Sequence, residues 1–510
     1  MAAKPEHEAK EIELKLVFDP ADAEALLAHP FLARIPAAPK KRELISVYYD
    51  TDDDALQREG VFLRVRSTGE GYVQTIKTAR GAGEFLERDE WECRLANHAP
   101  NLDAATGTAL APLLTENVRA GLRPRFQTRF RREAYCIEYA GTEIELAVDQ
   151  GEITAGAKAA PVSELELELK SGDRHTLFSL ARTLVKSLPL TLGVKTKAER
   201  GFELLDGGDH TVEKARQVEI SPDETCTEAF RIIARNCLRQ ILVNLPAMRA
   251  RRPEALHQMR VGLRRLRAAI TLFGDVVAGE QRQTVSNALT WITGELGPAR
   301  DLDVFIADIL VPQRASHADD PQVKAVYDDV LARRVAAYDR AIEATSSSRF
   351  RLALIDLGAW IEIGDWRGEE NPFPEEPVAA YATEKLSSLR RAIKKKGENF
   401  RKLSVAERHR LRIRAKRLRY ATEFFATTFV GARCDKRRRK SLVALQKLQD
   451  ALGILNDIST RQALLAEGGD ALDESRRAML VVDPGEEKGW RKEAKRAYAR
   501  FADVKAFWKV

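Results

Sequence analysis

Apolar and polar residues alternate with a period of two in short segments between residues 8 and 205. A strand places successive side chains on opposite faces of a sheet, so this alternation predicts strands. The segments that show it are residues 11–17, 44–50, 61–67, 72–78, 88–95, 128–139, 143–149 and 163–170. Eight strands with interspersed helices, such as one at 177–187, favour an eight-stranded antiparallel tunnel or barrel in an α+β domain over residues 8–205.

The pattern changes at about residue 219, where apolar residues begin to recur at i, i+3, i+4 and i+7. This spacing is typical of amphipathic helices, and it predicts an all-α domain over residues 219–510. The stretch 206–218, which begins Asp-Gly-Gly-Asp, predicts a linker between the two domains. A stretch rich in Gly, Pro and Glu at 368–377 predicts a loop within the helical half.

The helical half contains two copies of one pattern. Leu-His-Gln-Met-Arg at 256–260 corresponds to Arg-His-Arg-Leu-Arg at 408–412, and an Arg-rich or Lys-rich segment follows each at the same spacing. Farther along, Leu-Gly-Pro-Ala-Arg-Asp at 296–301 corresponds to Leu-Gly-Ile-Leu-Asn-Asp at 452–457. Two segments in the same order at nearly the same offset predict a pseudo-two-fold pair of helical bundles. The predicted bundles cover residues 219–367 and 378–510.

The charge is distributed unevenly. The net charge of the 510 residues is +7, but residues 401–450 contain 16 Lys and Arg against 4 Asp and Glu. A concentrated basic surface implies a polyanionic partner such as nucleic acid, anionic lipid or polyphosphate. No apolar run approaches the roughly 20 residues that span a bilayer, and the polar first residues do not resemble a signal peptide, so no membrane role is expected.

The remaining motifs exclude several classes of function. The five cysteines are scattered, odd in number and without CxxC spacing, which argues against disulfides and zinc and favours a reducing cytoplasm. The sequence has no P-loop, no HExxH and no nucleophile elbow. It also lacks an aromatic-interleaved basic strand and a recognition-helix motif, so nucleic acid is an unlikely partner.

Two segments concentrate carboxylates. Glu-Ile-Glu-Leu-Lys at 11–15 and Glu-Leu-Glu-Leu-Glu at 164–168 each place three charged side chains on one strand face. Clustered carboxylates repel one another unless a cation lies between them, and hard oxygen donors suit Mg²⁺ or Mn²⁺. Further charged residues lie on or beside the other predicted strands: Arg64, Arg66, Lys77, Glu90, Arg132, Asp149 and Lys197.

These faces have two interpretations. The first is a set of amphipathic strands with solvated outer faces. The second is a closed tunnel with the charges inside, one wall acidic and the other basic. Arg and Lys would then bind phosphate oxygens, and the carboxylates would hold a metal that neutralises charge during phosphoryl transfer. The segregation of Arg and Glu pairs between strands favours the tunnel.

Residues 8–205 resemble a CYTH domain of the triphosphate tunnel metalloenzyme superfamily. Its ExExK signature stands at 11–15, and supporting segments stand at 63–66, 148–151, 164–168 and 197–201. The resemblance, strongest to the bacterial inorganic triphosphatase type, implies a tunnel that hydrolyses inorganic triphosphate with Mg²⁺ or Mn²⁺. A nucleoside or thiamine triphosphatase, an adenylyl cyclase and a non-catalytic polyphosphate-binding scaffold are the alternatives.

The resemblance also implies roles for individual residues. The phosphate-binding residues would be Lys15, Arg64, Arg66, Lys77, Arg132 and Lys197. The metal-linked carboxylates would be Glu11, Glu13, Glu90, Glu164, Glu166 and Glu168. Asp149 would position the attacking water, and Lys15, Arg64 and Arg66 would act with it in catalysis. Glu92 and Lys195 are alternatives to Glu90 and Lys197.

The helical repeats carry a second candidate site. His257, Arg260, Arg264 and Arg267 fall at i, i+3, i+7 and i+10, which is one helix face, and His409, Arg412, Lys416 and Arg419 repeat it. A solvated basic stripe is the plain interpretation, but the repetition favours an anion site. A metal site with Asp301 or Asp457 is the alternative.

Residues 219–510 resemble a CHAD domain, which implies binding to inorganic polyphosphate and location at polyphosphate granules in the cytoplasm. The expected polyphosphate-binding residues are His257, Arg260, Arg264, Arg265, Arg267, Arg300, His409, Arg412, Lys416, Arg417 and Arg419.

Overall fold

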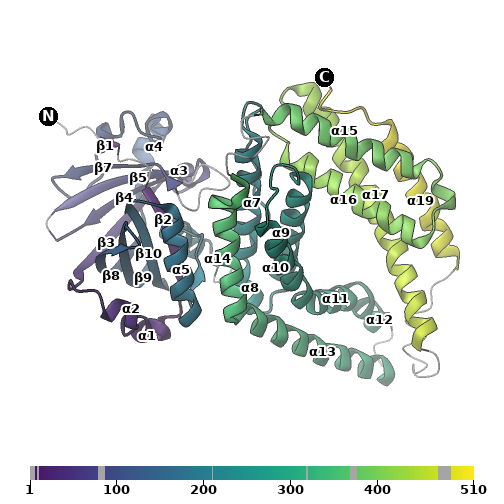
Figure 1. The fold of residues 1–510 in the computed structure, drawn as a ribbon, viewed down its shortest axis with the longest axis horizontal. Coiled ribbons are helices and arrows are strands. Elements are labelled where there is room, and N and C mark those ends of the chain that lie inside the picture. The colour runs from purple at the N-terminus through teal and green to yellow at the C-terminus, as the bar shows by residue number, and fades with distance from the viewer. Residues whose placement is uncertain are drawn as a thin grey trace.

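The alternating segments form one antiparallel sheet that curls into a tunnel at one end of the molecule (Figure 1). The computed structural model describes residues 6–7, 11–69, 71–78, 87–208, 211–316, 320–367, 376–468 and 484–509. Eight longer strands are β2 (Glu11–Val17), β3 (Lys40–Asp50), β4 (Val61–Ser67), β5 (Tyr72–Thr78), β7 (Glu90–Leu95), β8 (Arg123–Tyr139), β9 (Thr142–Ala155) and β10 (Lys158–Ser171). Three strands of two residues are β1 (Glu6–His7), β6 (Glu87–Arg88) and β11 (Thr191–Leu192).

The sheet closes through the segment that holds β6 and β7. The strand order is β1-β7-β5-β4-β3-β8-β9-β10-β2-β11, and β6 pairs with β2. Glu11 is the backbone partner of Arg88, while Glu90, two residues later, is the partner of Lys77 on β5. One segment therefore bridges the two ends of the sheet. This arrangement confirms the antiparallel tunnel that the alternation predicts.

Strands β3 and β9 extend beyond the limits that the pattern predicts. β3 begins at Lys40 instead of residue 44, because a ladder needs only backbone partners and Lys40 finds one in Ala134. β9 continues to Ala155 past a polar stretch that interrupts the alternation. Glycine at position 151 makes this continued pairing possible. A Cβ atom there would lie 2.1 Å from the backbone oxygen of Arg129 on β8, so any other residue would clash with that strand.

The apolar strand faces point outward and bury against helices. Leu14, Leu165 and Leu167 are 0% exposed and pack with helix α5 (Arg174–Ser187) in one hydrophobic cluster. Because side chains alternate, this packing turns the charged residues of β2 and β10 into the tunnel. Short helices α1 (Ala23–Leu27), α2 (Pro30–Ala33), α3 (Ala55–Arg58) and α4 (Glu116–Gly121) cover its outside and rims, and α6 (Lys197–Leu205) packs on β8, β9 and β10.

Helix α6 is anchored where Gly201 meets Phe126. A Cβ atom on Gly201 would lie 2.1 Å from the Phe126 ring, which also stacks on Tyr48 at 4.6 Å between ring centroids. We expect Gly201→Ala to lower the free energy of unfolding by about 1–3 kcal/mol, because a packed ring cannot move aside without strain. Urea denaturation measures this. An unchanged urea midpoint would contradict this expectation and show that α6 can move away from Phe126 to make room for the added methyl group.

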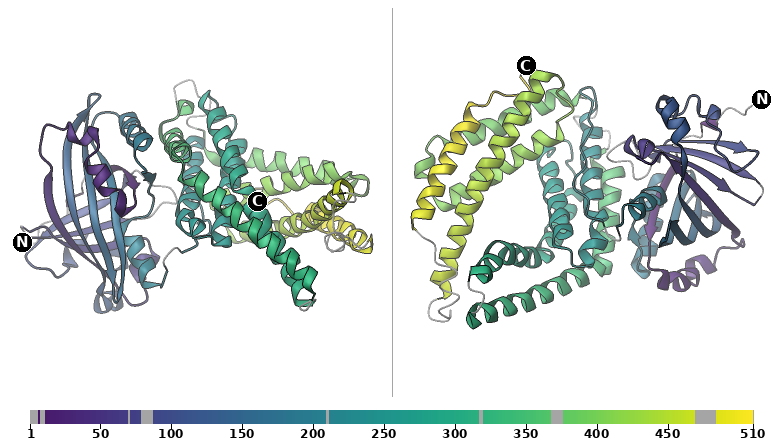
Figure 2. Two further views of the ribbon diagram at one scale, coloured as in Figure 1. Left: turned by 90° about the horizontal axis from the view of Figure 1, so that it is seen from below. Right: turned by 180° about the vertical axis from the view of Figure 1, so that it is seen from behind.

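The second half consists of helices joined by loops, after a stretch at 211–221 that is neither helix nor strand. Its longer helices are α7 (Cys226–Val243), α9 (Pro253–Leu272), α10 (Gln281–Glu295), α11 (Gly297–Phe305), α13 (Pro321–Ser346), α14 (Ser348–Ile363), α15 (Val378–Gly397), α16 (Val405–Phe424), α17 (Ala432–Gly468) and α19 (Pro484–Asp503), with short helices α8 (Leu245–Arg249) and α12 (Val311–Ser316). Figure 2 shows α14 beside the sheet and α15, α17 and α19 farther from it. None of the described helices has the length and apolar character needed to cross a membrane.

The two sequence repeats occupy equivalent helices. Residues 256–260 lie on α9 and residues 408–412 lie on α16, and these two helices pack on each other. The downstream segments differ in shape. In the first copy, Pro298 lies in the first turn of α11, which follows α10 after a break. The equivalent residue of the second copy is Ile454, which has a backbone N–H that a helix can use. Helix α17 therefore continues through this position, unbroken for 37 residues.

Candidate active site

A cavity of about 230 Å³ lies inside the tunnel. Its lining residues come from seven strands and from α6: Glu13, Lys15, Tyr48, Phe62, Arg64, Arg66, Lys77, Thr78, Glu90, Glu92, Arg132, Glu166, Glu168, Lys170, Thr196, Lys197 and Ala198. All six residues expected to bind phosphate line this cavity. The charged strand faces therefore point inward, as the tunnel interpretation requires.

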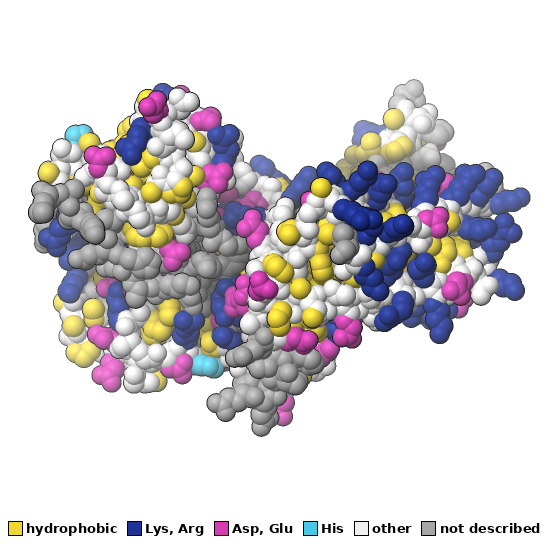
Figure 3. All heavy atoms as spheres, turned by 90° about the horizontal axis from the view of Figure 1, so that it is seen from above, with side chains coloured by type: hydrophobic (Ala, Val, Ile, Leu, Met, Phe, Trp, Pro, Cys, Tyr) yellow, Lys and Arg dark blue, Asp and Glu magenta, His cyan; other side chains and the backbone are white. Residues whose placement is uncertain are grey.

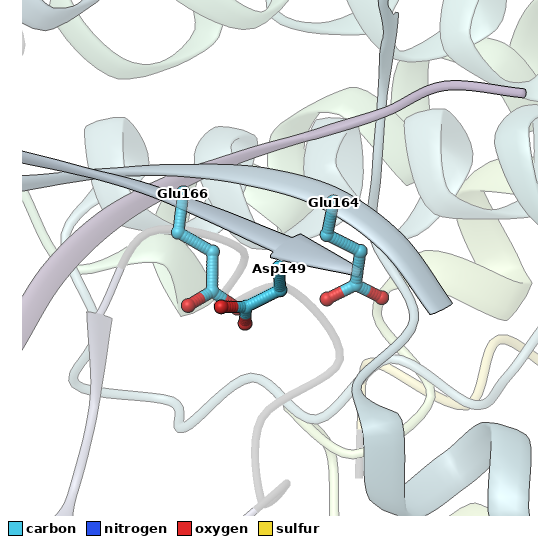
Figure 4. A group of neighbouring side chains, drawn as sticks. All are labelled: Asp149, Glu164 and Glu166. Carbon is cyan, nitrogen blue, oxygen red and sulfur yellow. The ribbon is translucent and has the colours of Figure 1, made fainter. Parts of the chain in front are cut away.

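One wall has a centre of three buried carboxylates. Ligand atoms of Asp149, Glu164 and Glu166 all lie within 4.8 Å of one another, and Figure 4 shows the three side chains close together. Asp149 and Glu164 are 0% exposed, and Glu166 is 8% exposed. They meet because Glu164 on β10 is the backbone partner of Asp149 on β9, while Glu166 is two residues along the same face. We call Asp149, Glu164 and Glu166 the carboxylate centre.

Three cations surround the carboxylate centre. Lys197 Nζ lies 2.8 Å from Asp149, 2.8 Å from Glu164 and 2.9 Å from Glu166. Lys15 Nζ lies 3.1 Å from Glu164 and 3.3 Å from Glu166. Arg132 donates two hydrogen bonds of 2.7 Å to Asp149 and a further one to Glu166. Buried carboxylates are stable only with such partners, and Arg200, 3.1 Å from Glu164, adds a fourth cation at the edge of the centre.

Close ion pairs shift the pKa values of Glu164, Glu166 and Lys197. Burial raises the pKa of Glu166, but ion pairs with Lys197, Arg132 and Lys15 outweigh it and hold that pKa well below the usual value. Burial also opposes ionisation of Glu164, yet Lys15 and Lys197 lower its pKa to about 2. Conversely, burial lowers the pKa of Lys197, but the neighbouring carboxylates, Asp149 above all, raise it well above normal. Glu164, Glu166 and Lys197 are therefore charged at neutral pH.

The opposite wall is mainly basic. Burial, together with the charges of Arg64 and Arg132, lowers the pKa of Arg66 to about 10, and its Nε donates to Ser46 Oγ at 3.1 Å. Glu90 lies on this wall, in ion pairs with Lys77 and, at 3.4 Å, with Arg64. Arg64 and Arg66 both line the cavity, and two neighbouring guanidinium groups suit a phosphate group.

The other expected carboxylates lie outside the carboxylate centre. Glu13 lines the cavity 3.9 Å from Lys15 Nζ, and Glu168 lines it in an ion pair with Lys170. Glu92, the alternative to Glu90, also lines the cavity and accepts a 2.8 Å hydrogen bond from Thr75. The side chain of Glu11 lies outside the described residues.

The tunnel contains functional neighbours that the sequence reasoning did not single out. Arg200 donates to Glu164 at 3.1 Å, and the Phe130 ring lies 4.9 Å from Lys197 Nζ. Arg200 lies in the 197–201 segment, so its position beside Lys197 could have indicated a role in the tunnel. Phe130 looks like any other apolar strand residue, so the sequence does not distinguish it. Lys197 faces the carboxylate centre, while Lys195 pairs with Glu203 and Glu213 instead.

A divalent cation fits the donor set. The carboxylate centre offers hard oxygen atoms from three residues, which Mg²⁺ and Mn²⁺ prefer, and Glu166 also reaches the cavity. Lys15 and Lys197 lie among these oxygens, so a metal and the two ammonium groups compete for them. The lysine side chains are long and flexible, which allows them to turn toward an anion in the cavity.

The helical half presents its own basic face along α9 and α16. His257, Arg260 and Arg264 are partly buried there, and Arg267 is exposed. Arg265 is different, because it is 3% exposed and donates to Asn236 at 3.0 Å and Gln240 at 2.9 Å. Its side chain therefore points into the core and away from this face. Arg300 is partly exposed near His257, and burial together with Arg300 lowers the pKa of His257.

The second copy reproduces the arrangement on α16. Arg412, Lys416 and Arg419 are partly exposed, and His409 and Arg417 are exposed. In each copy a glycine lets an arginine lie against the neighbouring helix: a Cβ on Gly297 would be 3.4 Å from Arg260, and one on Gly453 would be 3.4 Å from Arg412. The copies differ at Asn456, which stands where the first copy has Arg300 and lies 2.9 Å from His409 Nδ1.

The two copies also meet. Arg264 of the first copy is close enough to help lower the pKa of Lys416 in the second. The Nε atoms of Arg264, Arg412 and Arg419 are buried without a hydrogen-bond partner among the described residues. We call His257, Arg260, Arg264, Arg412, Lys416 and Arg419 the basic face.

Many more Lys and Arg side chains cover the end of the helical half that lies farthest from the sheet (Figure 3).

Two family models match separate parts of the chain. Residues 9–202 match the family model of the CYTH domain, and residues 232–466 match that of the CHAD domain. An inorganic triphosphatase of Haemophilus influenzae is 31% identical over 197 residues, which are 38% of this chain and 55% of that protein. The chain thus matches only about half the length of this relative.

Solved structures resemble each half separately. The CHAD domain from the plant Ricinus communis is 28% identical, with a TM-score of 0.48, over 58% of this chain and 99% of its own. A Hippeastrum protein described as having a dominant triphosphatase activity is 19% identical, with a TM-score of 0.29, over 39% of this chain and 96% of its own.

Proposed function

Because the chain belongs to the CYTH family over residues 9–202 and to the CHAD family over residues 232–466, we propose that it is an inorganic triphosphatase with a polyphosphate-binding module. The observation that carries the proposal is the two-walled cavity, in which Arg64, Arg66 and Lys77 face a carboxylate centre that suits a metal. The Haemophilus influenzae relative, an inorganic triphosphatase by name, supports this substrate.

The residues of the tunnel divide the chemistry between them. Arg64, Arg66 and Lys77 bind phosphate oxygens of the triphosphate, where fixed cations stabilise the charge that develops during transfer. Mg²⁺ or Mn²⁺, held by Glu166 with Glu164, would neutralise phosphate charge and lower the pKa of a water molecule. Lys15 and Lys197 turn from the carboxylates to the phosphate as substrate enters. Asp149, which is enclosed by Arg132 and Lys197, takes part in positioning water once these side chains turn.

Substrate and metal dependence test this proposal together. We expect phosphate release from tripolyphosphate with Mg²⁺ or Mn²⁺, a loss of turnover with EDTA, and slower turnover of ATP and thiamine triphosphate. Preference for ATP or thiamine triphosphate would replace the substrate and keep the tunnel chemistry. Absence of turnover with every substrate would leave a binding scaffold.

The basic face supports polyphosphate binding by the helical half, and through it association with polyphosphate granules. Arg264, Arg412 and Lys416 are partly exposed on this face, where their charged groups can meet phosphate oxygens. A linear anion along α9 and α16 would contact both copies. The helical half would then hold polymer close to a tunnel that hydrolyses short chains.

Polyphosphate binding should weaken above pH 8 because of Lys416. Burial and the charges of Arg412, Arg264 and Arg419 lower its pKa to about 8, so its ammonium group loses its proton as the pH rises from 7 to 9. A bound polyanion favours the charged form, so binding should take up a proton near pH 8. Affinity measured at pH 7, 8 and 9 and constant ionic strength should fall. The fall should disappear in Lys416→Arg, which stays charged; an equal fall in both proteins would contradict the assignment.

A further inference from the structure

Arg239 reaches from the helical half to the loop in front of α6. Its guanidinium donates to the backbone oxygen of Val194 at 2.8 Å and to Glu199 Oε1 at 2.8 Å, and it lies 3.6 Å from Glu213. The Arg239 side chain is 14% exposed and that of Glu199 is 12% exposed, so solvent screens the pair little. Neither residue lines the tunnel cavity.

Glu199 uses its two carboxylate oxygens for different purposes. Oε2 accepts a 2.9 Å hydrogen bond from the backbone N–H of Thr196, and Thr196 Oγ1 accepts one of 3.0 Å from the backbone N–H of Glu199. This reciprocal pair is a capping box that fixes the first turn of α6. Oε1 accepts from Arg239 and, at 3.0 Å, from Arg216. One carboxylate thus caps α6 and ties it to the helical half.

Lys197 is the residue between these anchors. It is the first residue of α6, and its Nζ lies within 2.9 Å of all three members of the carboxylate centre. Arg239 holds the chain on both sides of it, at Val194 and at Glu199. The same loop supports β2, because the N–H of Gly193 donates to the backbone oxygen of Lys15 at 2.9 Å. A shift of this loop would move both lysines of the acidic wall.

We infer that Arg239 is a positioning residue for the tunnel: through Val194 and Glu199 it fixes the backbone from which the side chains of Lys197 and Lys15 reach the carboxylate centre and the cavity. Tunnel activity then depends on the docked helical half. The inference rests on the proposed triphosphatase function. A second contact between the halves gives a comparison, because Arg182 on α5 donates to Asp356 on α14 at 2.8 Å and neither residue lines the cavity.

Four variants of the full chain test the inference: Arg239→Ala, Glu199→Gln, the double variant, and Arg182→Ala as the matched control. Glutamine at position 199 can still accept the capping hydrogen bond but loses the charge that Arg239 meets. We expect Arg239→Ala to lower kcat for tripolyphosphate roughly tenfold, as is typical for residues that orient ligating groups. KM should change less than kcat, because Arg64, Arg66 and Lys77 still bind the phosphate, and Tm should match that of Arg182→Ala.

The double variant shows whether Arg239 acts through Glu199. The losses of the two single variants should overlap in the double variant, because both changes remove the contact between Arg239 and Glu199 and only the ion pair of Glu199 with Arg216 is left for the second change to weaken. Equal kcat in Arg239→Ala and Arg182→Ala, or losses that multiply in the double variant, would overturn the inference and leave the triphosphatase proposal intact.

Hydrogen exchange separates the inference from the proposed function. If the wild-type protein hydrolyses no triphosphate, the proposed function fails, and exchange of the amides of residues 194–202 decides whether Arg239 positions the loop. Faster exchange in Arg239→Ala than in Arg182→Ala would support the positioning role. Equal exchange would overturn it.

Discussion

Glu166→Gln should abolish most of the tripolyphosphate hydrolysis, with a fall in kcat on the order of a hundredfold or more. Among the described residues, Glu166 alone both lines the cavity and belongs to the carboxylate centre. Glutamine has almost the same shape but lacks the negative charge, and its amide group would turn N–H donors toward Lys197 or Arg132. The site then loses a metal ligand and retains an uncompensated cation.

Kinetics of phosphate release at saturating Mg²⁺, together with Mg²⁺ titrations, would measure this effect. The matched control is Glu43→Gln on β3, because Glu43 is exposed and pairs with Arg129 on the outer surface. The control should retain wild-type kcat. A Glu166→Gln protein with activity within a few-fold of the control would remove Glu166 from the metal site and would direct attention to Glu13 and Glu168.

The tunnel was predictable because its strands follow a strict alternation. Leu14 and Leu165 are buried, so Glu13 and Glu166, one position away, lie on the opposite faces of their strands, and the structure shows that these faces line the cavity. The alternation does not reveal which carboxylates converge. That depends on strand register: the pairing of Asp149 with Glu164 builds the carboxylate centre, while the pairing of Lys77 with Glu90 places Glu90 among the cations.

In the helical half, too, the sequence pattern predicted which faces carry charge but not every contact. The repeated spacing of His, Arg and Lys located the faces of α9 and α16, because helical periodicity is regular. Arg265 was grouped with them through its neighbours in sequence, yet it lies in the core and bonds to Asn236. The contact between Arg239 and Glu199 could not be foreseen, because it joins residues of two domains whose docking is set by the packing of α5 and α14.

Arg264→Ala combined with Arg412→Ala should weaken polyphosphate binding by more than a hundredfold. Each arginine comes from a different copy, and each side chain is partly exposed on the basic face. Hydrogen bonds to charged groups contribute about 1.5–3 kcal/mol each, which is about tenfold or more per residue. Loss of two phosphate contacts should also reduce the slope of log affinity against log salt by about 1.4–1.8, because fewer counterions are released.

Titrations of polyphosphate at several salt concentrations would measure both effects. Arg333→Ala combined with Arg491→Ala is the matched control, since it removes the same charge from exposed ion pairs with Asp329 and Glu487. If binding depends only on net charge, the two double variants should weaken equally, and the basic face would then be one part of a diffuse cationic surface. If binding depends on the basic face, only the Arg264 and Arg412 variant should lose affinity, and its tripolyphosphate turnover should stay at the wild-type level because the tunnel is unchanged.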